Sequence, residues 1–521
     1  MIFGSQILVT ILIIVFSIYS LNLFFSIRKN GSTTTSRSAS SGGNKQLLPP
    51  GRSRLSFISE TMDFFRASLD GVPEKFFFDR IQKYSSQVFK TSLFTQTVTV
   101  IGVTASGNKF LLSNEYKLVN SWFPKSILDI FPLGKKCVGN QEFHKWLRRM
   151  YSQSLNPGSV HNFVGVMDSM TRQHFETYWD KNINTVNDDE GMRITTTVQP
   201  LVSKNSFAIA CRYTLGIDYH LESHWVDELY KLFSIVNIGI LSLPINLPGT
   251  KLNRSIKAYK LIEKNIQKVF EQRNIDVSSY SDDTKNGRAS MPQDMLSRLI
   301  IMSQVDSSGI DEKFIIDLVI GIMFGSSTSM GVVMTLIVKY LSDFPDVYNK
   351  VLEEQTAVAY SKGTRELLNF SDIQKMKYSW NMICEVMRVS TPSPVGFKTA
   401  SDDLWYDGYF ISKGTKLCWS AAGTHMNPDC FTNPKKFDPC RFEEGNKLAP
   451  YTFIPFGGGP SVCPGKEFAQ QEMLVFLHQL VRRYKWEKHM PNHDEEEEKI
   501  RFKPYPLVTT GHSIHLRPHL N

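Results

Sequence analysis

Residues 456–465 of this 521-residue chain place one cysteine in a short loop made largely of glycine and proline. The loop reads Phe-Gly-Gly-Gly-Pro-Ser-Val-Cys-Pro-Gly, with the cysteine at position 463. Glycine adopts backbone conformations with positive φ and Pro464 carries no N–H, so the segment predicts an irregular turn. A helix is expected directly after Gly465, and a helix N-terminus stabilises a nearby thiolate. A thiolate held in this way is a suitable axial ligand for a haem iron.

The loop resembles the cysteine signature of the cytochrome P450 family, F-x-x-G-x-R-x-C-x-G. Phe456, Gly459, Cys463 and Gly465 match this pattern. Ser461 stands where the family has an arginine that holds a haem propionate. The resemblance implies haem b as cofactor, these four residues as part of its binding loop, and Cys463 as the iron ligand. The alternative for the loop alone is an ordinary buried cysteine in a glycine-rich turn.

Two further motifs follow in the family's order. Glu385 and Arg388 form an E-x-x-R within a helix-periodic segment, so the two side chains share one helix face. Arg441 lies in Phe-Asp-Pro-Cys-Arg-Phe, similar to the family's F-x-P-x-R-F. An isolated E-x-x-R is common on solvated helices, but the order and spacing of the motifs support one another. The resemblance implies a buried structural triad of Glu385, Arg388 and Arg441. Loss of one member would leave the others as buried charges without their counter-charge.

A long apolar run from Phe314 to Tyr340 has no charged residue between Leu318 and Val338. It is long enough to span a bilayer, but small polar residues at 325–329 interrupt its centre. The resemblance implies a helix on the distal side of the haem, where the family has an acid followed by a threonine that relay protons. Thr328 and Ser329 occupy these two catalytic positions. Ser329 keeps a hydroxyl, whereas Thr328 cannot act as the acid's proton reservoir.

The loss of the distal acid leaves several alternatives open. A water chain or a substrate hydroxyl could deliver protons, or the chemistry could be rearrangement, desaturation or C–C cleavage. Losing one proton-relay group generally costs a factor of roughly 10²–10⁴ in rate. The main expectation is a haem-thiolate monooxygenase that hydroxylates a large apolar terpenoid or steroid with O₂ and reductase-supplied electrons. A non-catalytic haem-binding scaffold is the alternative from a different class.

Two basic residues could compensate for Ser461. Arg148 shares a helix face with His144, four positions earlier, and the family uses an arginine in this segment for a haem propionate. Arg148 is therefore the first candidate for propionate binding and Lys398 the second. The alternative for each is a plain surface base.

Further segments narrow the resemblance. Leu48-Pro49-Pro50-Gly51 and Cys463-Pro464-Gly465-Lys466-Glu467 look like plant members that oxidise triterpenes, in a clade that includes brassinosteroid and taxane-type oxidases. The resemblance covers residues 48–521 and implies one mainly α domain with small β-sheets, an α+β fold. A hairpin is predicted at 89–101, where alternating residues flank Thr95-Gln96.

Composition bounds the remaining possibilities. The seven cysteines are odd in number and have no C-x-x-C spacing, which argues against a disulfide framework or a zinc site. The net charge of +9 is not gathered into a nucleic-acid motif. Basic residues in segments that the family places on the proximal side of the haem would suit an acidic reductase; plain solvated lysines are the alternative.

The N-terminus predicts a membrane anchor. Residues 7–27 are uncharged and mostly apolar, and Arg28-Lys29 follow at once. A positive charge after the apolar run favours an uncleaved span with the catalytic domain in the cytosol. We therefore expect an anchor at 1–28, a flexible linker with a Pro-rich hinge at 29–50 and a catalytic domain at 51–521. The expected location is the endoplasmic reticulum membrane, single-pass, with electrons from NADPH through NADPH–cytochrome P450 reductase.

Overall fold

The computed structural model describes residues 46–51, 57–94, 96–180, 187–188, 191–192, 194–219, 222–285, 294–305, 310–363, 366–488, 499–502, 506–508 and 512–519. The predicted anchor at 1–28 and most of the predicted linker at 29–50 lie outside these ranges. Thr95 of the predicted turn Thr95-Gln96 also lies outside them.

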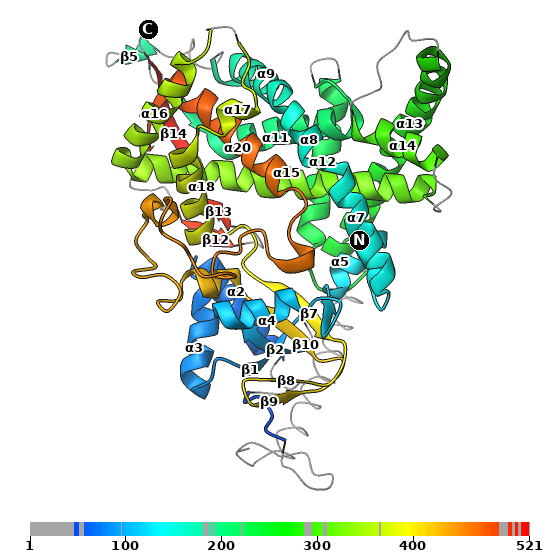
Figure 1. The fold of residues 1–521 in the computed structure, drawn as a ribbon, viewed down its shortest axis with the longest axis vertical. Coiled ribbons are helices and arrows are strands. Elements are labelled where there is room, and N and C mark those ends of the chain that lie inside the picture. The colour runs from blue at the N-terminus through cyan, green and yellow to red at the C-terminus, as the bar shows by residue number, and fades with distance from the viewer. Residues whose placement is uncertain are drawn as a thin grey trace, which may run out of the picture.

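Helices form most of the described chain, and the largest sheet lies with α2, α3 and α4 in the lower part of the view, while β14 lies among the helices above (Figure 1). The α-helices are α2 (Phe57–Leu69), α3 (Glu74–Tyr84), α4 (Ala105–Ser113), α5 (Lys125–Ile130), α6 (Pro132–Cys137), α7 (Gln141–Ser154), α8 (Pro157–Asn162), α9 (Val164–His174), α11 (Val198–Leu215), α12 (Ser223–Gly239), α13 (Lys251–Lys285), α14 (Met295–Val305), α15 (Glu312–Asp343), α16 (Pro345–Tyr360), α17 (Phe370–Ile373), α18 (Lys377–Val389), α19 (Ala421–His425) and α20 (Lys466–Arg483). Short π and 3₁₀ segments are η2 (Phe175–Trp179), η3 (Pro439–Phe442) and η4 (Gly459–Ser461).

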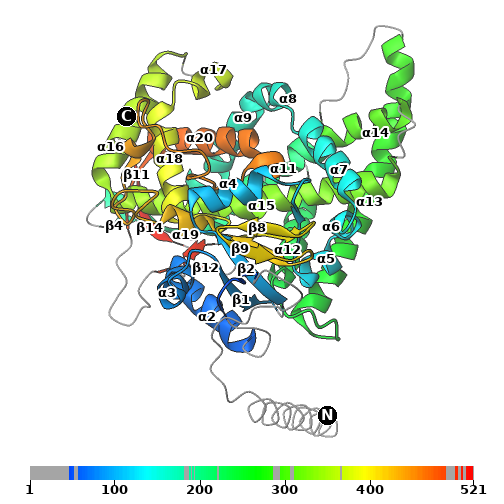
Figure 2. The same cartoon turned by 60° about the horizontal axis from the view of Figure 1, so that its bottom comes forward.

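The largest sheet has the strand order β1-β2-β10-β7-β3, and Figure 2 shows it beside α2 and α3. Its strands are β1 (Phe89–Leu93), β2 (Gln96–Gly102), β3 (Val119–Ser121), β7 (Gly396–Ala400) and β10 (Lys416–Trp419). The antiparallel pairing of β1 with β2 confirms the predicted hairpin. The remaining strands are β4 (Asn187–Asp188), β5 (Gly191–Met192), β6 (Ile194–Thr197), β8 (Leu404–Tyr406), β9 (Tyr409–Ile411), β11 (Tyr484–Lys488), β12 (Ile500–Phe502), β13 (Pro506–Val508) and β14 (Ser513–Pro518).

The apolar run noted in the sequence forms α15, which crosses the middle of the molecule (Figure 1). Asp311 caps its start by accepting a hydrogen bond from the Phe314 N–H at 2.6 Å, and Pro345 opens α16 directly after it. By length and composition α15 could cross a membrane, but 65% of its most apolar stretch is buried inside the protein. Most of the helix outside the polar run at 325–329 is apolar because other parts of the protein cover it.

Helix α20 carries a buried carboxyl group without a counter-charge. Glu472 is 1% exposed, and neither carboxyl oxygen has a hydrogen-bond partner with good geometry among the described residues. Burial raises the pKa of Glu472 to about 8, although the nearby Ser206 hydroxyl on α11 opposes the rise. A charged carboxylate at this position would be unfavourable, so the folded protein holds Glu472 protonated at neutral pH.

This raised pKa predicts a pH-dependent stability. Because the folded state binds a proton that the unfolded state releases above pH 4.5, the free energy of unfolding falls as pH rises from about 4.5 to about 8. Glu472→Gln, a neutral isostere, should remove roughly 3–5 kcal/mol of this fall. Urea unfolding at pH 5 and pH 8 measures it, with exposed Glu487→Gln as the control. An unchanged pH slope in Glu472→Gln would contradict the assignment.

Candidate functional site

The cysteine loop is held by backbone contacts rather than by regular structure. Gly457 and Gly459 have left-handed φ values of 71° and 63°. A Cβ on Gly459 would lie 1.9 Å from the Leu112 carbonyl oxygen, so only glycine fits against the end of α4. The Cys463 N–H donates to the Phe456 carbonyl at 2.9 Å, and α20 begins three residues later. These contacts fix the position from which the thiol projects.

The Cys463 thiol is open to a cavity but surrounded by protein elsewhere. Burial raises the pKa of this thiol, while the Gly465 backbone N–H and the Arg148 charge oppose the rise. The Gly465 N–H at the start of α20 favours the thiolate, as the sequence analysis expected, whereas desolvation disfavours it. Coordination of a metal cation removes the proton from a thiol outright. Cys463 faces the cavity, and its role as the iron ligand stays the prediction made from the loop.

The cavity has a volume of about 480 Å³ and lies between the cysteine loop, α7, α11, α15 and the start of α20. Its lining is mostly apolar and comprises Arg148, Tyr151, Leu155, Ala210, Tyr213, Thr214, Gly321, Ile322, Gly325, Ser326, Ser329, Met330, Val333, Met387, Pro392, Ser393, Trp419, Pro455, Phe456, Gly457, Ser461, Cys463, Pro464, Gly465, Phe468, Ala469 and Met473. Of the predicted cofactor-binding residues, Arg148, Phe456, Cys463 and Gly465 line it. Gly459 and Lys398 do not.

One end of the cavity carries unpaired polar atoms. The Nε of Arg148 and the hydroxyl oxygen of Ser461 are buried without a well-formed hydrogen bond, while another Arg148 nitrogen donates to the Val462 carbonyl. Space is open beside Gly457, where a Cβ would meet no atom within 4 Å. A flat ligand with carboxylates at one edge satisfies these features. The residues present therefore fit a haem, with Cys463 as ligand and Arg148 at the carboxylate end.

Lys398 forms an ion pair with Glu115 and does not line the cavity. It is 3% exposed, and its Nζ lies 2.7 Å from the Glu115 carboxylate and 3.1 Å from the Ser121 hydroxyl. Burial lowers the pKa of Lys398, while Glu115 opposes that shift. Its positive charge is neutralised within the protein, so its contact with a propionate stays a prediction.

The two distal positions, Thr328 and Ser329, differ in whether they line the cavity. Ser329 lines the cavity, and its hydroxyl donates to the Gly325 carbonyl one turn earlier at 2.8 Å. Ser326 also lines the cavity, whereas Thr328 does not. The replacement of the family's acid therefore lies beside the cavity wall rather than on it. Two serines of α15, Ser326 and Ser329, therefore line the cavity.

The three charged residues of the predicted triad lie together behind the cysteine loop. Arg388 binds Glu385 through two hydrogen bonds, from Nε at 2.6 Å and from Nη2 at 2.8 Å, and both side chains are fully buried. Arg441 Nε lies 3.4 Å from Glu385, and its other nitrogens donate to the Thr432 and Asn433 carbonyls. Helix α18 is thereby tied to η3.

His425 is a supporting residue that the sequence analysis missed. Its carbonyl accepts a hydrogen bond from Arg388 at 2.9 Å, and its Nε2 accepts one from the Ile454 N–H at 3.0 Å. Burial lowers its pKa to about 3, so the ring stays neutral and can accept. His425 connects the buried ion pair to the segment that enters the cysteine loop. An isolated histidine without a motif offers no sequence signal for this role.

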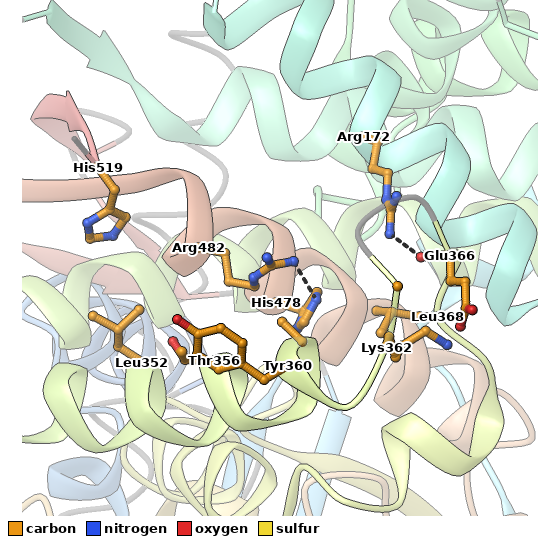
Figure 3. A pocket seen from close by; sticks show the side chains of 12 residues that line it. Arg172, Leu352, Thr356, Tyr360, Lys362, Glu366, Leu368, His478, Arg482 and His519 are labelled. Carbon is orange, nitrogen blue, oxygen red and sulfur yellow. Dashed lines mark hydrogen bonds between the residues drawn. The ribbon is translucent and has the colours of Figure 1, made fainter. Parts of the chain in front are cut away.

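A second cavity of about 410 Å³ lies elsewhere and has a basic lining (Figure 3). Arg172 and Arg482 project into it, with Arg482 directed toward His478 (Figure 3). Arg482 follows Lys466 by 16 residues on α20, a distance of roughly 24 Å along a helix. This cavity shares no lining residue with the Cys463 cavity. We therefore look for the catalytic site in the cavity that Cys463 lines.

A loop cysteine that faces an apolar cavity, a long helix that lines this cavity, and a carboxylate-binding end together define a haem-thiolate oxygenase. The chain belongs to the cytochrome P450 family, whose model matches residues 49–510. It is accordingly a monooxygenase of the oxidoreductase class, with haem bound through a cysteine thiolate and electrons supplied by a reductase.

Curated relatives cover nearly the whole chain. A β-amyrin 28-monooxygenase of Medicago truncatula is 41% identical over 98% of this chain and 98% of its own length. A β-amyrin 28-monooxygenase of Vitis vinifera is 41% identical over 91% and 92%, and cytochrome P450 716A1 of Arabidopsis thaliana is 42% identical over 90% and 93%. Among solved structures, retinoic acid-bound cyanobacterial CYP120A1 superposes with a TM-score of 0.74 at 22% identity, covering 91% of this chain and 100% of its own. The solved structure supports the mainly helical fold.

Proposed function

We propose that this chain oxidises a triterpenoid related to β-amyrin. The observation that carries the proposal is the 41% identity, over 98% of both chains, to a β-amyrin 28-monooxygenase. The cavity agrees with a large apolar substrate, since Ile322, Met330 and Val333 of α15 face it. Apolar contact area of this kind binds a hydrocarbon skeleton without directional bonds.

The described residues supply binding and proton handling. Haem iron, when bound to Cys463, supplies the oxygen-activating chemistry of the family. Arg148 and Ser461 would hold the carboxylate edge of the haem, and the apolar wall would exclude water from the reacting face. Ser329 presents its hydroxyl to the same cavity and can hold a proton there. We assign it the relay role that Thr328, set beside the wall, does not have.

Ser329→Ala should therefore lower product formed per NADPH consumed by roughly tenfold to hundredfold, because it removes the hydroxyl from the cavity wall. Thr328→Ala should change this ratio little. Coupling is measured as product against NADPH oxidation in reconstituted membranes. Equal losses in the two variants would contradict the assignment. A large gain in Thr328→Asp would show that the native relay is impaired rather than specialised.

Membrane attachment is part of the proposal. Residues 1–28 would form the anchor, 29–50 the linker and 51–521 the cytosolic catalytic domain at the endoplasmic reticulum. The described chain offers support next to α12, where Ile238, Leu243 and Leu247 are 55%, 69% and 62% exposed. Exposed apolar residues clustered in this way suit contact with a membrane surface. NADPH–cytochrome P450 reductase in the same membrane would supply electrons.

The test is conversion of β-amyrin by microsomes that contain the chain, a plant reductase and NADPH under isotope-labelled dioxygen. One labelled oxygen in the product supports the proposal. An unlabelled product would favour desaturation, rearrangement or C–C cleavage, which the missing distal acid at Thr328 keeps as the second candidate. Thiolate-bound haem with no product from β-amyrin or related triterpenoids would overturn the substrate assignment.

A further inference from the structure

The basic cavity of Figure 3 lies between segments that are distant in the chain: α9, α16, the residues that follow α16, and the C-terminal part of α20. Its volume of about 410 Å³ is sufficient for a small molecule. Leu352, Ala359 and Leu368 give it an apolar side. The hydroxyl groups of Thr356 and Tyr360 also line it, and neither forms a hydrogen bond within the described chain.

Arg482 brings a positive charge to this cavity without a carboxylate partner in the described chain. Its hydrogen bond there runs from Nη1 to the Nε2 of His478 at 3.5 Å. The adjacent Arg483, by contrast, pairs with Asp180 at 3.2 Å. Desolvation and the nearby charge of Arg172 lower the pKa of Arg482, which agrees with a guanidinium that lacks a counter-charge.

His478 orients the guanidinium but cannot neutralise it. The His478 side chain is buried, and its Nδ1 lies 2.8 Å from the Gln355 Oε1. The Gln355 amide nitrogen donates to the Ser379 hydroxyl at 2.7 Å, so the amide oxygen is the acceptor and Nδ1 carries the proton. The Nε2 of His478 then presents a lone pair to Arg482. Burial lowers the pKa of His478 to about 3, so the ring stays neutral.

Arg172 lines the same cavity as part of a neutral pair. One of its terminal nitrogens lies 2.8 Å from the Asp168 carboxylate and donates to the Glu366 carbonyl, also at 2.8 Å. Asp168 is fully buried and also accepts from the Gln479 amide at 2.6 Å, so Arg172 is held rigidly. Its Nη1 donates to no group of the described chain. Arg172 therefore offers a fixed donor at no cost in rearrangement.

The lysine on the opposite wall belongs to a group with excess positive charge. Lys362 lies 2.6 Å from Asp372, and the same carboxylate lies 3.2 Å from Lys375. Two cations thus share one anion. Glu366 is the acidic residue among the described lining residues, and its exposed carboxylate lies across the pocket from Arg482 in Figure 3. The described charges in and directly behind the cavity therefore leave a net positive charge.

We propose that this cavity binds a phosphate monoester. The guanidinium of Arg482 can bind two phosphate oxygens at once, and Arg172 approaches from α9 with a further N–H. The hydroxyls of Thr356 and Tyr360 can donate to the third oxygen. A phosphate monoester carries a charge of about −1.5 to −2, which suits the excess positive charge. A planar carboxylate has one acceptor oxygen fewer than these donors can serve.

The remaining space fits the organic part of the ester, against the apolar side at Leu352, Ala359 and Leu368. The phosphate group is the same whether the ester is dissolved in the cytosol or forms the headgroup of a lipid. The cavity shares no lining residue with the cavity of Cys463, so the inference depends neither on haem chemistry nor on the oxidised substrate.

The first test is calorimetric titration of the purified full-length holoprotein with inorganic phosphate and with glycerol 3-phosphate at constant ionic strength. Wild type should bind both saturably with one site per chain, and glycerol should not bind. Arg482→Gln should weaken both affinities at least roughly tenfold, because it removes the charged fork. Arg482→Lys keeps the charge without the fork and should fall between the two.

Arg254→Gln is the matched control. Arg254 is an exposed arginine of α13 that has no ion pair in the described chain and lines neither of the two cavities. Its loss should change the phosphate affinity by less than about twofold, because exposed charges act weakly at a distance in salt. The absorption band of the reduced, carbon monoxide-bound haem should be the same in all variants, which shows that each is folded.

The second test identifies the source of the phosphate group. The holoprotein is placed in phosphatidylcholine bilayer discs with or without phosphatidic acid, and binding of radiolabelled inorganic phosphate is measured. A lipid headgroup in the cavity predicts that phosphatidic acid displaces the label from wild type. A soluble ester predicts equal binding in both kinds of disc, with displacement by added glycerol 3-phosphate.

Three results would overturn the proposal. Wild type could show no saturable phosphate binding, Arg482→Gln could bind as well as wild type, or Arg482→Gln and Arg254→Gln could weaken binding equally. A cavity that binds no phosphate but in which the reductase shields Arg482 from chemical modification would instead receive an acidic side chain of a protein. Failure to oxidise β-amyrin bears on the proposed function and leaves the phosphate result intact.

Discussion

Cys463→Ser is expected to lose monooxygenase activity entirely and to lose the red-shifted absorption band of reduced, carbon monoxide-bound haem-thiolate. Serine keeps the size of the side chain and the loop geometry around Gly459, so the change is chemical rather than steric. A hydroxyl does not ionise near neutral pH and donates far less electron density to iron than a thiolate. Difference spectra of membranes and product analysis measure the two losses.

A matched control uses another cysteine of the same region. Cys440 lies in η3, is partly exposed and does not line the cavity. Cys440→Ser should keep both the band and the activity. A band that survives in Cys463→Ser would mean that a different residue ligates the iron, and the cavity assignment would then be wrong.

Arg388→Met is expected to destabilise the protein by about 3–5 kcal/mol, because it removes the two hydrogen bonds that Arg388 donates to Glu385 in a site with no solvent access and leaves Glu385 with the longer 3.4 Å contact to Arg441. Arg388 also donates to the His425 and Lys436 carbonyls, so the same substitution frees two more buried acceptors. Urea unfolding followed by tryptophan fluorescence and by haem absorbance measures the loss.

The double variant Glu385→Gln/Arg388→Met gives the sharper result. It should cost less than the sum of the two single variants, because each single variant already removes the interaction between the two side chains, and Arg441 keeps its carbonyl acceptors in both backgrounds. The exposed pair Lys377–Glu444 provides the control, since water screens such pairs and Lys377→Met should change stability little. Additive losses at Glu385 and Arg388 would mean that the two side chains do not act as a pair.

Features encoded over short stretches of sequence were predictable. The cysteine loop depends on adjacent glycines and prolines, and the β1–β2 hairpin depends on a local turn, so both follow from neighbouring residues. The apolar composition of 314–340 predicted a long helix, and burial by its neighbours shows why it is apolar on nearly every face. The positions of Glu385 and Arg388 on one face followed from helical spacing.

Features that depend on contacts between distant segments were not predictable. Gly459 packs against the Leu112 carbonyl across 347 residues of chain, and no periodicity links the two. The partner of Lys398 is likewise 283 residues away, so the sequence analysis could not see that Glu115 neutralises it. Glu472 is buried near Ser206 of α11, which lies 266 residues earlier in the chain. Each of these depends on tertiary packing, which a single sequence does not encode in a readable form.

The distance in sequence between Leu112 and Cys463 has a consequence for biosynthesis. At about 5–20 residues per second, the 351 positions that separate them take roughly 18–70 s to translate. During that interval α4 and α7 exist without the loop that Leu112 and Arg148 contact, and the cavity has no ligand for iron. Haem can therefore be captured only once the last tenth of the chain has left the ribosome. The yield of active protein should depend on the haem supply after translation ends, and not on the supply while the chain is being made.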